Sequence, residues 1–242
     1  MANLIIPILM YHQIDKAPPR GTPFRSLVVS QRMFKWQMRV IKALGYRGLS
    51  IGELEPYLLG QLHSKVVGIT FDDGFRNVID FGLPILQEMG FTATAYVLSS
   101  RSLKENSWDA AIGVPQKPLM TSRCIHEWIS AGMEIGAHSI SHQDLTLLSN
   151  QEAFRQISVS KSELAEITGG EIRHFCYPYG RFNGDHITMV REAGYQTATT
   201  VEPGRFRLGD DWLQMPRVMV ARTHHPLLFA LKAFAGRGDP RR

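Results

Sequence analysis

Short apolar runs alternate with helical patterns along the whole chain. Turn residues bound these runs, and several are rich in β-branched residues, which is typical of buried strands. Seven runs are expected to form strands: 4–10, 65–71, 92–98, 133–138, 174–177, 196–201 and 214–220. Strands that alternate with helices in this way indicate a parallel sheet with helices packed outside it.

Capping residues mark several of the predicted helices. A serine stands at positions 30, 50 and 149, and after the last two a glutamate three residues later completes the capping-box pattern. The expected helices are 31–44, a short helix after position 50, 75–89, 121–131, 150–168, 183–193 and 226–235.

The length of 242 residues suits a single α/β domain. We expect one domain, 1–242, built as a closed or nearly closed (β/α) barrel, with an open doubly wound sheet as the alternative. The long polar segment 99–120 is typical of a functional or mobile loop. The last residues, 236–242 (GRGDPRR), are expected to form a flexible, solvated tail.

Composition excludes several classes of protein. Hydrophobic residues make up 44% and charged residues 20%, which is ordinary for a globular protein. Lys and Arg total 27 against 22 Asp and Glu, but they form no basic block, so we expect no nucleic-acid partner. With two cysteines, no signal-peptide pattern and no apolar run of about 20 residues, we expect a cytoplasmic protein without a membrane span.

Polar side chains gather where three of the predicted strands end. Asp72 and Asp73 follow strand 65–71, His138 and His142 follow strand 133–138, and the YPYG sequence of 177–180 follows the strand at 174. The carboxyl ends of parallel strands share one face of such a fold, and ligands bind there. These three clusters are therefore expected to meet at one rim.

Two histidines four residues apart can direct both imidazoles at one point. Together with one of the two aspartates they make a His₂Asp set, which leaves a position open for water, as in catalytic sites for zinc or a similar divalent ion. The other aspartate can act as a general base towards that water. The backbone N–H of Tyr179 is a candidate donor to the oxyanion.

These motifs resemble those of the polysaccharide deacetylase family, the NodB-homology domains also known as carbohydrate esterase family 4. The similar segments are TFDDG at 70–74, GAHSISH at 136–142 and YPYG at 177–180. The segments PILMYHQI at 7–14 and MPRVMV at 215–220 are more similar to the branch that deacetylates poly-N-acetylglucosamine and related glycans.

The resemblance implies a distorted (β/α)₇ barrel and metal-dependent hydrolysis of N-acetyl groups on sugars. It assigns Asp72 as the general base and gives the metal to Asp73, His138 and His142. The expected ion is zinc, with cobalt, nickel or manganese as alternatives. Water activated by the metal would attack the acetamide carbonyl, and the Tyr179 amide would help to stabilise the oxyanion.

The sequence departs from the family pattern at two places. Cys176 stands where many members carry an arginine that orients the base, and Arg217 is our candidate for its substitute. The histidine that protonates the leaving amine has no clear signature; we expect His225 in this role, with His224 as the second choice.

Aromatic residues and one further histidine are expected to contact the substrate. Trp108, Trp212 and Tyr179 have flat rings that match the apolar face of a pyranose. Tyr177 belongs to the third motif, and His12 follows the first strand, so both are expected at the site.

We therefore expect a deacetylase acting on an N-acetylated sugar, a glycan or a lipid-linked glycan intermediate. Two alternatives are an amidase of the same fold that cleaves a formamido sugar or a ureide, and a catalytically silent carbohydrate-binding homologue. The absent arginine at position 176 favours the silent homologue, whereas the complete Asp and His set favours an enzyme.

Overall fold

Seven parallel strands form a closed ring, which confirms the predicted barrel and excludes the open sheet. In order around the ring they are β2 (Ile8–Tyr11), β12 (Met215–Met219), β10 (Thr197–Pro203), β9 (His174–Cys176), β8 (Glu134–Ala137), β7 (Thr94–Val97) and β6 (Val66–Phe71), and β6 pairs again with β2. The computed structural model describes residues 5–240, and each predicted strand contributes one strand to this ring within that range.

The barrel is distorted at β6. The first half of β6 pairs with the short strand β5 (Arg47–Leu49), and its last two residues pair with β7. The sequence pattern did not predict β5, because three residues are too few to show an alternation. Outside the ring, β1 (Ile5–Ile6) pairs with β11 (Phe206–Arg207), and β3 (Gln13–Ile14) pairs with β4 (Val28–Val29).

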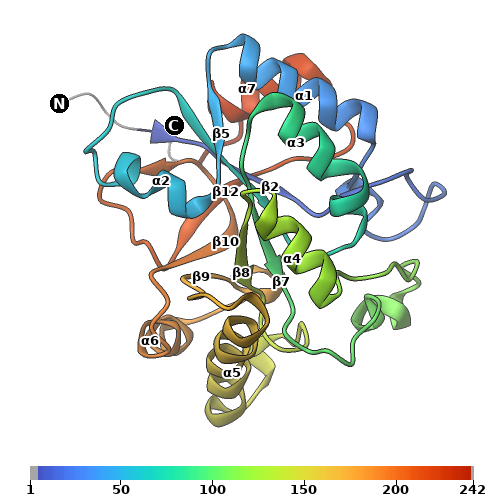
Figure 1. Cartoon of the computed structure of the whole chain (residues 1–242), viewed down its shortest axis with the longest axis vertical. Helices are drawn as coiled ribbons and strands as arrows, with labels where there is room; N and C mark the ends of the chain where they lie inside the picture. The colour runs from blue at the N-terminus through green and yellow to red at the C-terminus, as the bar shows by residue number, and fades with distance from the viewer. Residues whose placement is uncertain (1–4, 241–242) are drawn as a thin grey trace.

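Helices surround the barrel in the positions that the capping residues indicate (Figure 1). They are α1 (Gln31–Ala43), α2 (Ile51–Leu58), α3 (Leu83–Met89), α4 (Ser122–Ser130), α5 (Asn150–Thr168), α6 (Gly184–Glu192) and α7 (Pro226–Ala233). Ser30, Ser50 and Ser149 each accept a hydrogen bond from the backbone N–H three residues later. The two glutamates of the predicted capping boxes bond elsewhere: Glu53 accepts from Thr92, and Glu152 pairs with Arg155.

The predicted helix 75–89 is interrupted. It consists of a π-helical turn, Val78–Gly82, followed by α3. Pro84 explains the change, because it has no N–H to donate to the carbonyl four residues earlier, and a wider turn accommodates the missing bond.

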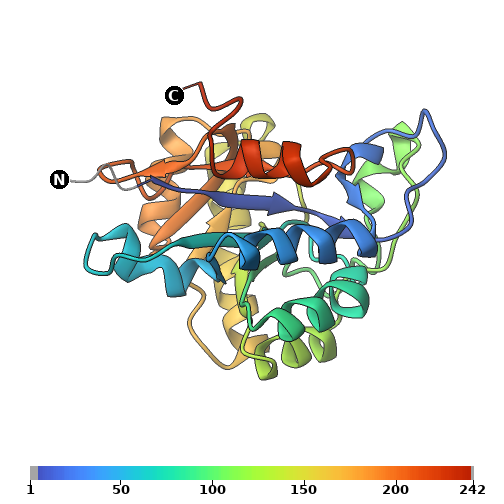
Figure 2. The same cartoon turned by 90° about the horizontal axis from the view of Figure 1, so that it is seen from above.

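The two ends of the barrel differ in their chemistry. At the carboxyl ends of the strands, the loop 13–28 and the segment 99–120 lie side by side (Figures 1 and 2), and an ion pair of 2.8 Å between Asp15 and Lys117 joins them. At the opposite end, α2 and β11 cover a small apolar cluster that includes Ile6, Leu54 and Phe206. The strand topology thus places the motif residues on the end that carries the two long loops.

The last described residues are docked on the barrel. Asp239 is buried and pairs with Arg205 at 3.3 Å and with Arg207 at 3.6 Å. This contact contradicts the expected solvated tail for 236–240, while 241 and 242 lie outside the described residues. The charged sequence suggested a tail, but the buried Arg205 gives Asp239 a partner that only the fold supplies.

Candidate active site

Asp73, His138 and His142 meet at the carboxyl ends of β6 and β8. The Nε2 atom of each imidazole lies 3.3 Å from Oδ1 of Asp73. All three residues are buried, and one potential ligand atom from each lies within 4.8 Å of the other two. Ligands at about 2.0–2.1 Å from a tetrahedral ion are about 3.3 Å apart, so this spacing suits a single metal ion.

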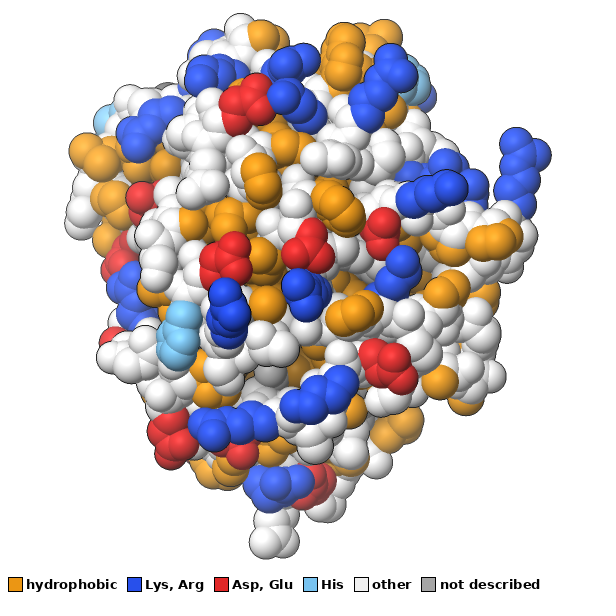
Figure 3. Space-filling view, turned by 45° about the vertical axis from the view of Figure 1, so that its right-hand side comes forward, with side chains coloured by type: hydrophobic (Ala, Val, Ile, Leu, Met, Phe, Trp, Pro, Cys, Tyr) orange, Lys and Arg blue, Asp and Glu red, His pale blue; other side chains and the backbone are white. Residues whose placement is uncertain are grey.

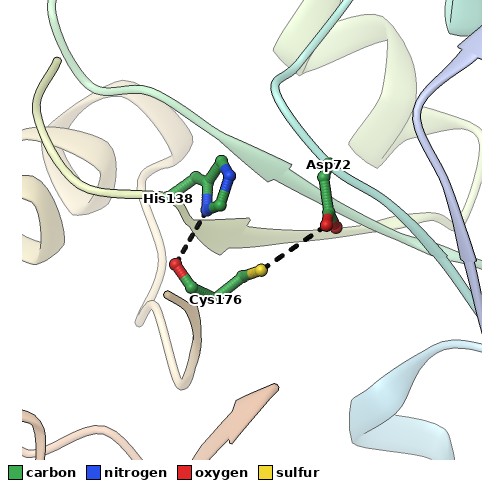
Figure 4. Close-up of side chains that lie close together, drawn as sticks. All are labelled: Asp72, His138 and Cys176. Carbon is green, nitrogen blue, oxygen red and sulfur yellow. Dashed lines mark hydrogen bonds between the residues drawn. The ribbon is translucent and has the colours of Figure 1, made fainter. Parts of the chain in front are cut away.

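The outer nitrogen of His138 is held in a way that favours metal binding. His138 Nδ1 donates to the backbone carbonyl of Cys176 at 2.7 Å (Figure 4), and its Nε2 faces Asp73. A carbonyl partner of this kind fixes the tautomer and orientation of a ligating imidazole. His142 is held by its neighbours, since Trp108 stacks on its ring with centroids 4.7 Å apart. The residues present therefore fit a divalent metal.

The backbone around this group is held in an uncommon conformation. Of the five non-glycine residues with positive φ between 5 and 240, all but Phe24 lie here: Asp73 at 71°, Ser139 at 69°, His142 at 59° and Tyr179 at 57°. Such residues cost free energy and cluster at functional sites, where the surrounding structure holds them in place. The tight turns direct two of the three potential ligands inward.

Asp72 faces a different partner from its neighbour. Arg217 on β12 donates from Nη1 to Oδ1 and from Nη2 to Oδ2 of Asp72, both at 2.7 Å. The guanidinium is fully buried and also donates to the Thr200 carbonyl and to the Thr70 hydroxyl. Two of its donors thus hold the carboxylate, while the bonds to Thr200 and Thr70 fix the guanidinium itself in place.

These contacts keep both aspartates ionised. Burial raises the pKa of Asp72, but the adjacent Arg217 outweighs it and leaves the pKa below its ordinary value. Burial also raises the pKa of Asp73, but hydrogen bonds from His138 and His142 outweigh it and hold the pKa well below the usual range. Two carboxylates can therefore lie side by side, because each has its own cationic or hydrogen-bonding partner.

A second set of possible ligands, Asp72, His138 and Cys176, lies next to the first. Figure 4 shows Cys176 between the other two, with its Sγ 3.7 Å from Asp72 Oδ2. The space beside Asp72 and Cys176 already contains Arg217, whose Nη2 lies 3.2 Å from the sulfur. A second metal ion would meet this guanidinium, so we assign no metal to the second set.

The three other candidate histidines, His12, His224 and His225, differ in their surroundings. His12 faces the site, and its Nε2 lies 4.0 Å from Asp72 Oδ2. His225 is exposed and stands at the N-cap position of α7 without a side-chain capping bond, while the Nδ1 of the buried His224 accepts from the backbone N–H of Ala221. The carbonyl of His224 accepts from Gln37 on α1, which places this loop outside the barrel. The His224 side chain is thus bonded within its own loop and the His225 side chain faces solvent, and neither makes a hydrogen bond or ion pair with Asp72 among residues 5–240.

The four aromatic candidates divide into two pairs. Trp108 and Tyr179 flank His142, and they line one cavity together with Asp144 and Leu147. Tyr177, by contrast, is fully buried in the core, and its hydroxyl donates to the Leu213 carbonyl.

Trp212 packs against the small apolar cluster at the opposite end of the barrel. The expectation that Tyr177 and Trp212 bind substrate conflicts with these positions. Tyr177 has no surface to offer to a ligand, and Trp212 precedes β12, whose first residue lies at the end away from the site.

Asp109 is a further acidic residue at the site that the sequence pattern did not single out. It lies on the short 3₁₀ helix η3 (Ser107–Ile112), next to Trp108, and lines a second cavity together with Asp73 and His12. Burial raises the pKa of Asp109. Its place in the long segment 99–120 was the only sequence signal available.

Sequence comparison decides the family. The model of the polysaccharide deacetylase family matches residues 60–198, which is more than half of the chain and includes all three motifs. The chain belongs to the polysaccharide deacetylase family. This match confirms the resemblance that the three motifs indicated.

Known members of the family are similar over most of this polysaccharide deacetylase chain. A putative polysaccharide deacetylase of Bacillus subtilis, YxkH, is 27% identical over 218 residues, covering 89% of this chain and 71% of that protein. The poly-β-1,6-N-acetyl-D-glucosamine N-deacetylase of Staphylococcus aureus is 21% identical over 226 residues, covering 88% and 78%. The deacetylase PplD of Streptococcus pyogenes, solved in complex with acetate, matches with a TM-score of 0.83 at 25% identity, covering 96% of this chain and 99% of that one.

The helices of this family member do not match a membrane span. Within residues 5–240, none is both long enough and apolar enough to cross a bilayer.

Proposed function

We propose that this chain is a metal-dependent deacetylase that removes N-acetyl groups from an N-acetylated glycan or a lipid-linked glycan intermediate. One observation supports this most directly: Asp72, held by Arg217, lies beside the Asp73, His138 and His142 group. A base held next to a metal-binding set is an arrangement that suits metal-assisted hydrolysis of an amide. The relatives that act on N-acetylglucosamine polymers support the choice of sugar.

Asp73, His138 and His142 would hold the divalent ion, with zinc as the first candidate. When bound, the ion would polarise the acetamide carbonyl and lower the pKa of water at the site. Asp72 accepts the proton of the attacking water, and Arg217 fixes the direction of its carboxylate. The guanidinium thus supplies the cation that many family members carry at the position of Cys176.

The leaving amine needs a proton donor, and we propose His12 for this role. Its Nε2 lies 4.0 Å from Asp72, so it borders the space in which the scissile amide must lie. Its Nδ1 is buried without a hydrogen-bond partner among the described residues. Neither His224 nor His225 has a comparable position.

The rim beside His142 suits a sugar ring. The Tyr179 ring meets the His142 ring edge to face at 4.4 Å, and Trp108 lies on the same imidazole. We propose that these two aromatic rings contact the pyranose, and that the backbone N–H of Tyr179 donates to the oxyanion.

The test is release of acetate from an N-acetylglucosamine oligomer by protein loaded with zinc. Asp72→Asn should abolish turnover and still bind one ion, whereas Asp73→Ala should lose the ion as well, as measured by metal analysis. Cys124→Ser, a change in a buried cysteine on α4, serves as the matched control. Release of formate or ammonia instead of acetate from a substrate panel, or full activity in Asp72→Asn, would contradict the proposal.

A further inference from the structure

Phe24 is an exposed aromatic residue in an uncommon backbone conformation. Its φ is 54°, in the left-handed region, and 47% of its surface is exposed. A bulky residue costs free energy in that region, and such positions persist where a tight structure or a function requires them. Phe24 belongs to neither apolar cluster of the described residues, so core packing does not account for its ring.

The loop that carries Phe24 is held by its own backbone. The N–H of Leu27 donates to the Phe24 carbonyl at 2.9 Å, and Arg25 Nε donates to the carbonyl of Pro18 at 2.7 Å. Pro18 and Pro23 each restrict φ at their positions. The aromatic ring is therefore presented at a fixed place, and a rigid contact of this kind binds a ligand with a small loss of entropy.

Phe24 lines a cavity that reaches the proposed active site. The cavity has a volume of about 220 Å³ and lies between the two long loops, and its lining includes Asp73 and His12. Apolar side chains form much of the lining, while Asp109 and Lys16 add polar groups. An apolar surface with a few polar groups is the usual composition of a site for a small ligand.

A separate cavity borders the same metal-binding set. It has a volume of about 560 Å³, and Trp108, His142 and Tyr179 belong to its lining. The two linings share no residue, but Asp73 of the first and His142 of the second lie 3.3 Å apart. The cavities therefore meet at the metal-binding set, and each offers an aromatic ring to a substrate that extends beyond it.

The chemistry of the cavity around Phe24 suits a sugar. A pyranose has an apolar face that stacks on an aromatic ring and hydroxyl groups at its edge that form hydrogen bonds. Phe24 supplies the ring, and Asp109 and Lys16 supply partners for hydroxyl groups. Figure 3 brings the side with the two long loops forward and shows hydrophobic side chains in small groups between charged ones. This surface favours a small polar ligand over a broad apolar partner.

We propose that Phe24 stacks on the sugar next to the one that is deacetylated, and that this contact makes the enzyme prefer a glycan chain to a monosaccharide. The inference rests on the proposed function and deepens it by naming a residue that determines chain-length preference. The neighbouring sugar occupies the cavity of Phe24 while the acetamido group reaches Asp73.

The experiment compares kcat/KM for acetate release from a β-1,6-linked N-acetylglucosamine pentamer with that from N-acetylglucosamine itself. Phe24→Ala removes the ring, Phe24→Tyr keeps a flat ring, and Phe24→Leu keeps an apolar side chain without one. The matched control, Phe154→Ala, removes an exposed phenylalanine from α5 that lines neither cavity.

In Phe24→Ala kcat/KM for the pentamer should fall by about tenfold, as expected for one lost aromatic contact. The value for the monosaccharide, which leaves the cavity of Phe24 empty, should stay at its wild-type level, even where that level is low. Phe24→Tyr and the control should keep wild-type values on both substrates, and Phe24→Leu should lose about as much as Phe24→Ala. Wild-type activity of Phe24→Ala on the pentamer, or an equal fall in the control, would overturn the proposal.

Vesicle sedimentation tests a membrane as the other occupant of this surface. The wild type and Phe24→Ala should bind equally to phosphatidylglycerol vesicles. Weaker binding of Phe24→Ala to the vesicles, with unchanged kcat/KM on the pentamer, would assign the ring to a lipid surface and overturn the sugar contact.

Calorimetric binding of the pentamer separates this inference from the proposed function. It is measured in the Asp72→Asn background, so that the ligand is not consumed. If no sugar releases acetate but Phe24→Ala weakens pentamer binding by about tenfold and Phe154→Ala does not, the Phe24 contact stands and the deacetylase proposal fails. If the pentamer releases acetate and Phe24→Ala changes neither its binding nor its kcat/KM, the Phe24 contact fails alone.

Discussion

Arg217 and Asp72, 145 residues apart in the chain, form a two-point ion pair with both hydrogen bonds at 2.7 Å. Arg217 belongs to β12, and Asp72 directly follows β6. These two strands flank β2 in the ring. The closed barrel therefore brings a cation from the end of the chain to a carboxylate near its beginning. The pair lies beside Cys176, whose sulfur is 3.2 Å from Arg217 Nη2 and whose position is the one that the family resemblance gives to an arginine.

Arg217→Met should lower kcat/KM by about a hundredfold at neutral pH, because Asp72 loses its orientation. Burial then raises the pKa of Asp72 without an opposing cation. Activity needs the carboxylate, so the acid limb of the pH profile should move to higher pH. Metal content should stay at one ion per chain, and a pH profile identical to the wild type would disprove the positioning role.

Cys176→Arg in the Arg217→Met background offers a rescue. The sulfur of Cys176 lies 3.2 Å from Arg217 Nη2, so an arginine at 176 can reach the same carboxylate. We expect kcat/KM of the double variant to be about tenfold higher than that of Arg217→Met alone. Cys176→Lys, with a single charged nitrogen, should recover less. Equal rescue by both would show that charge alone matters.

His12→Gln should lower kcat by about a hundredfold, since a general acid contributes about 10² to 10⁴. The matched variant His225→Gln changes an exposed residue at the start of α7 and should keep wild-type kcat. Both proteins should bind metal normally. The reverse order of effects, measured with the same N-acetylglucosamine oligomer, would return the proton-donor role to His225.

Trp108→Ala and Trp212→Ala separate the two ends of the barrel. Loss of Trp108 should raise KM by about tenfold, because an aromatic contact with the sugar is removed. Loss of Trp212 should cost about 2 kcal/mol of stability, since this side chain packs on an apolar cluster, and leave KM as it is. Steady-state kinetics and urea unfolding of both variants give the answer.

Glu134 should make stability depend on pH. Burial raises its pKa, but His174 and Thr94 outweigh burial and lower the pKa from 4.5 to about 2. A carboxylate with a depressed pKa contributes fully above its unfolded pKa, and the contribution is lost as pH falls through the folded one. Below pH 4.5 the free energy of unfolding of the wild type should fall by about 2 kcal/mol. Glu134→Gln lacks this contribution at every pH.

The measurement for Glu134 is urea unfolding between pH 5 and pH 2.5, in a chelator so that metal binding does not contribute. Glu192→Gln, a change at an exposed position, is the control and should follow the wild-type curve. If the free energy of unfolding depends on pH in the same way in the wild type and in Glu134→Gln, the contacts of Glu134 with His174 and Gly52 do not make stability depend on pH.

The sequence motifs held more information than the isolated histidines and aromatic residues. Asp73, His138 and His142 follow their strands directly, so the rule that parallel strands end on one face was enough to expect them together. The same rule could have removed Trp212, which precedes its strand. It could not remove Tyr177 or His225, because both follow strands, and only packing decides whether such a side chain faces the site or the core.

The sequence by itself determined the seven barrel strands, the family and the three candidate metal ligands, because apolar periodicity and short motifs are local properties of the chain. Only the tertiary structure decided that Arg217 holds Asp72, that His12 faces the site and His225 does not, and that Asp239 finds a buried arginine. Those outcomes depend on which strands become neighbours when the ring closes, and on which way each side chain then points. No local pattern carries that information.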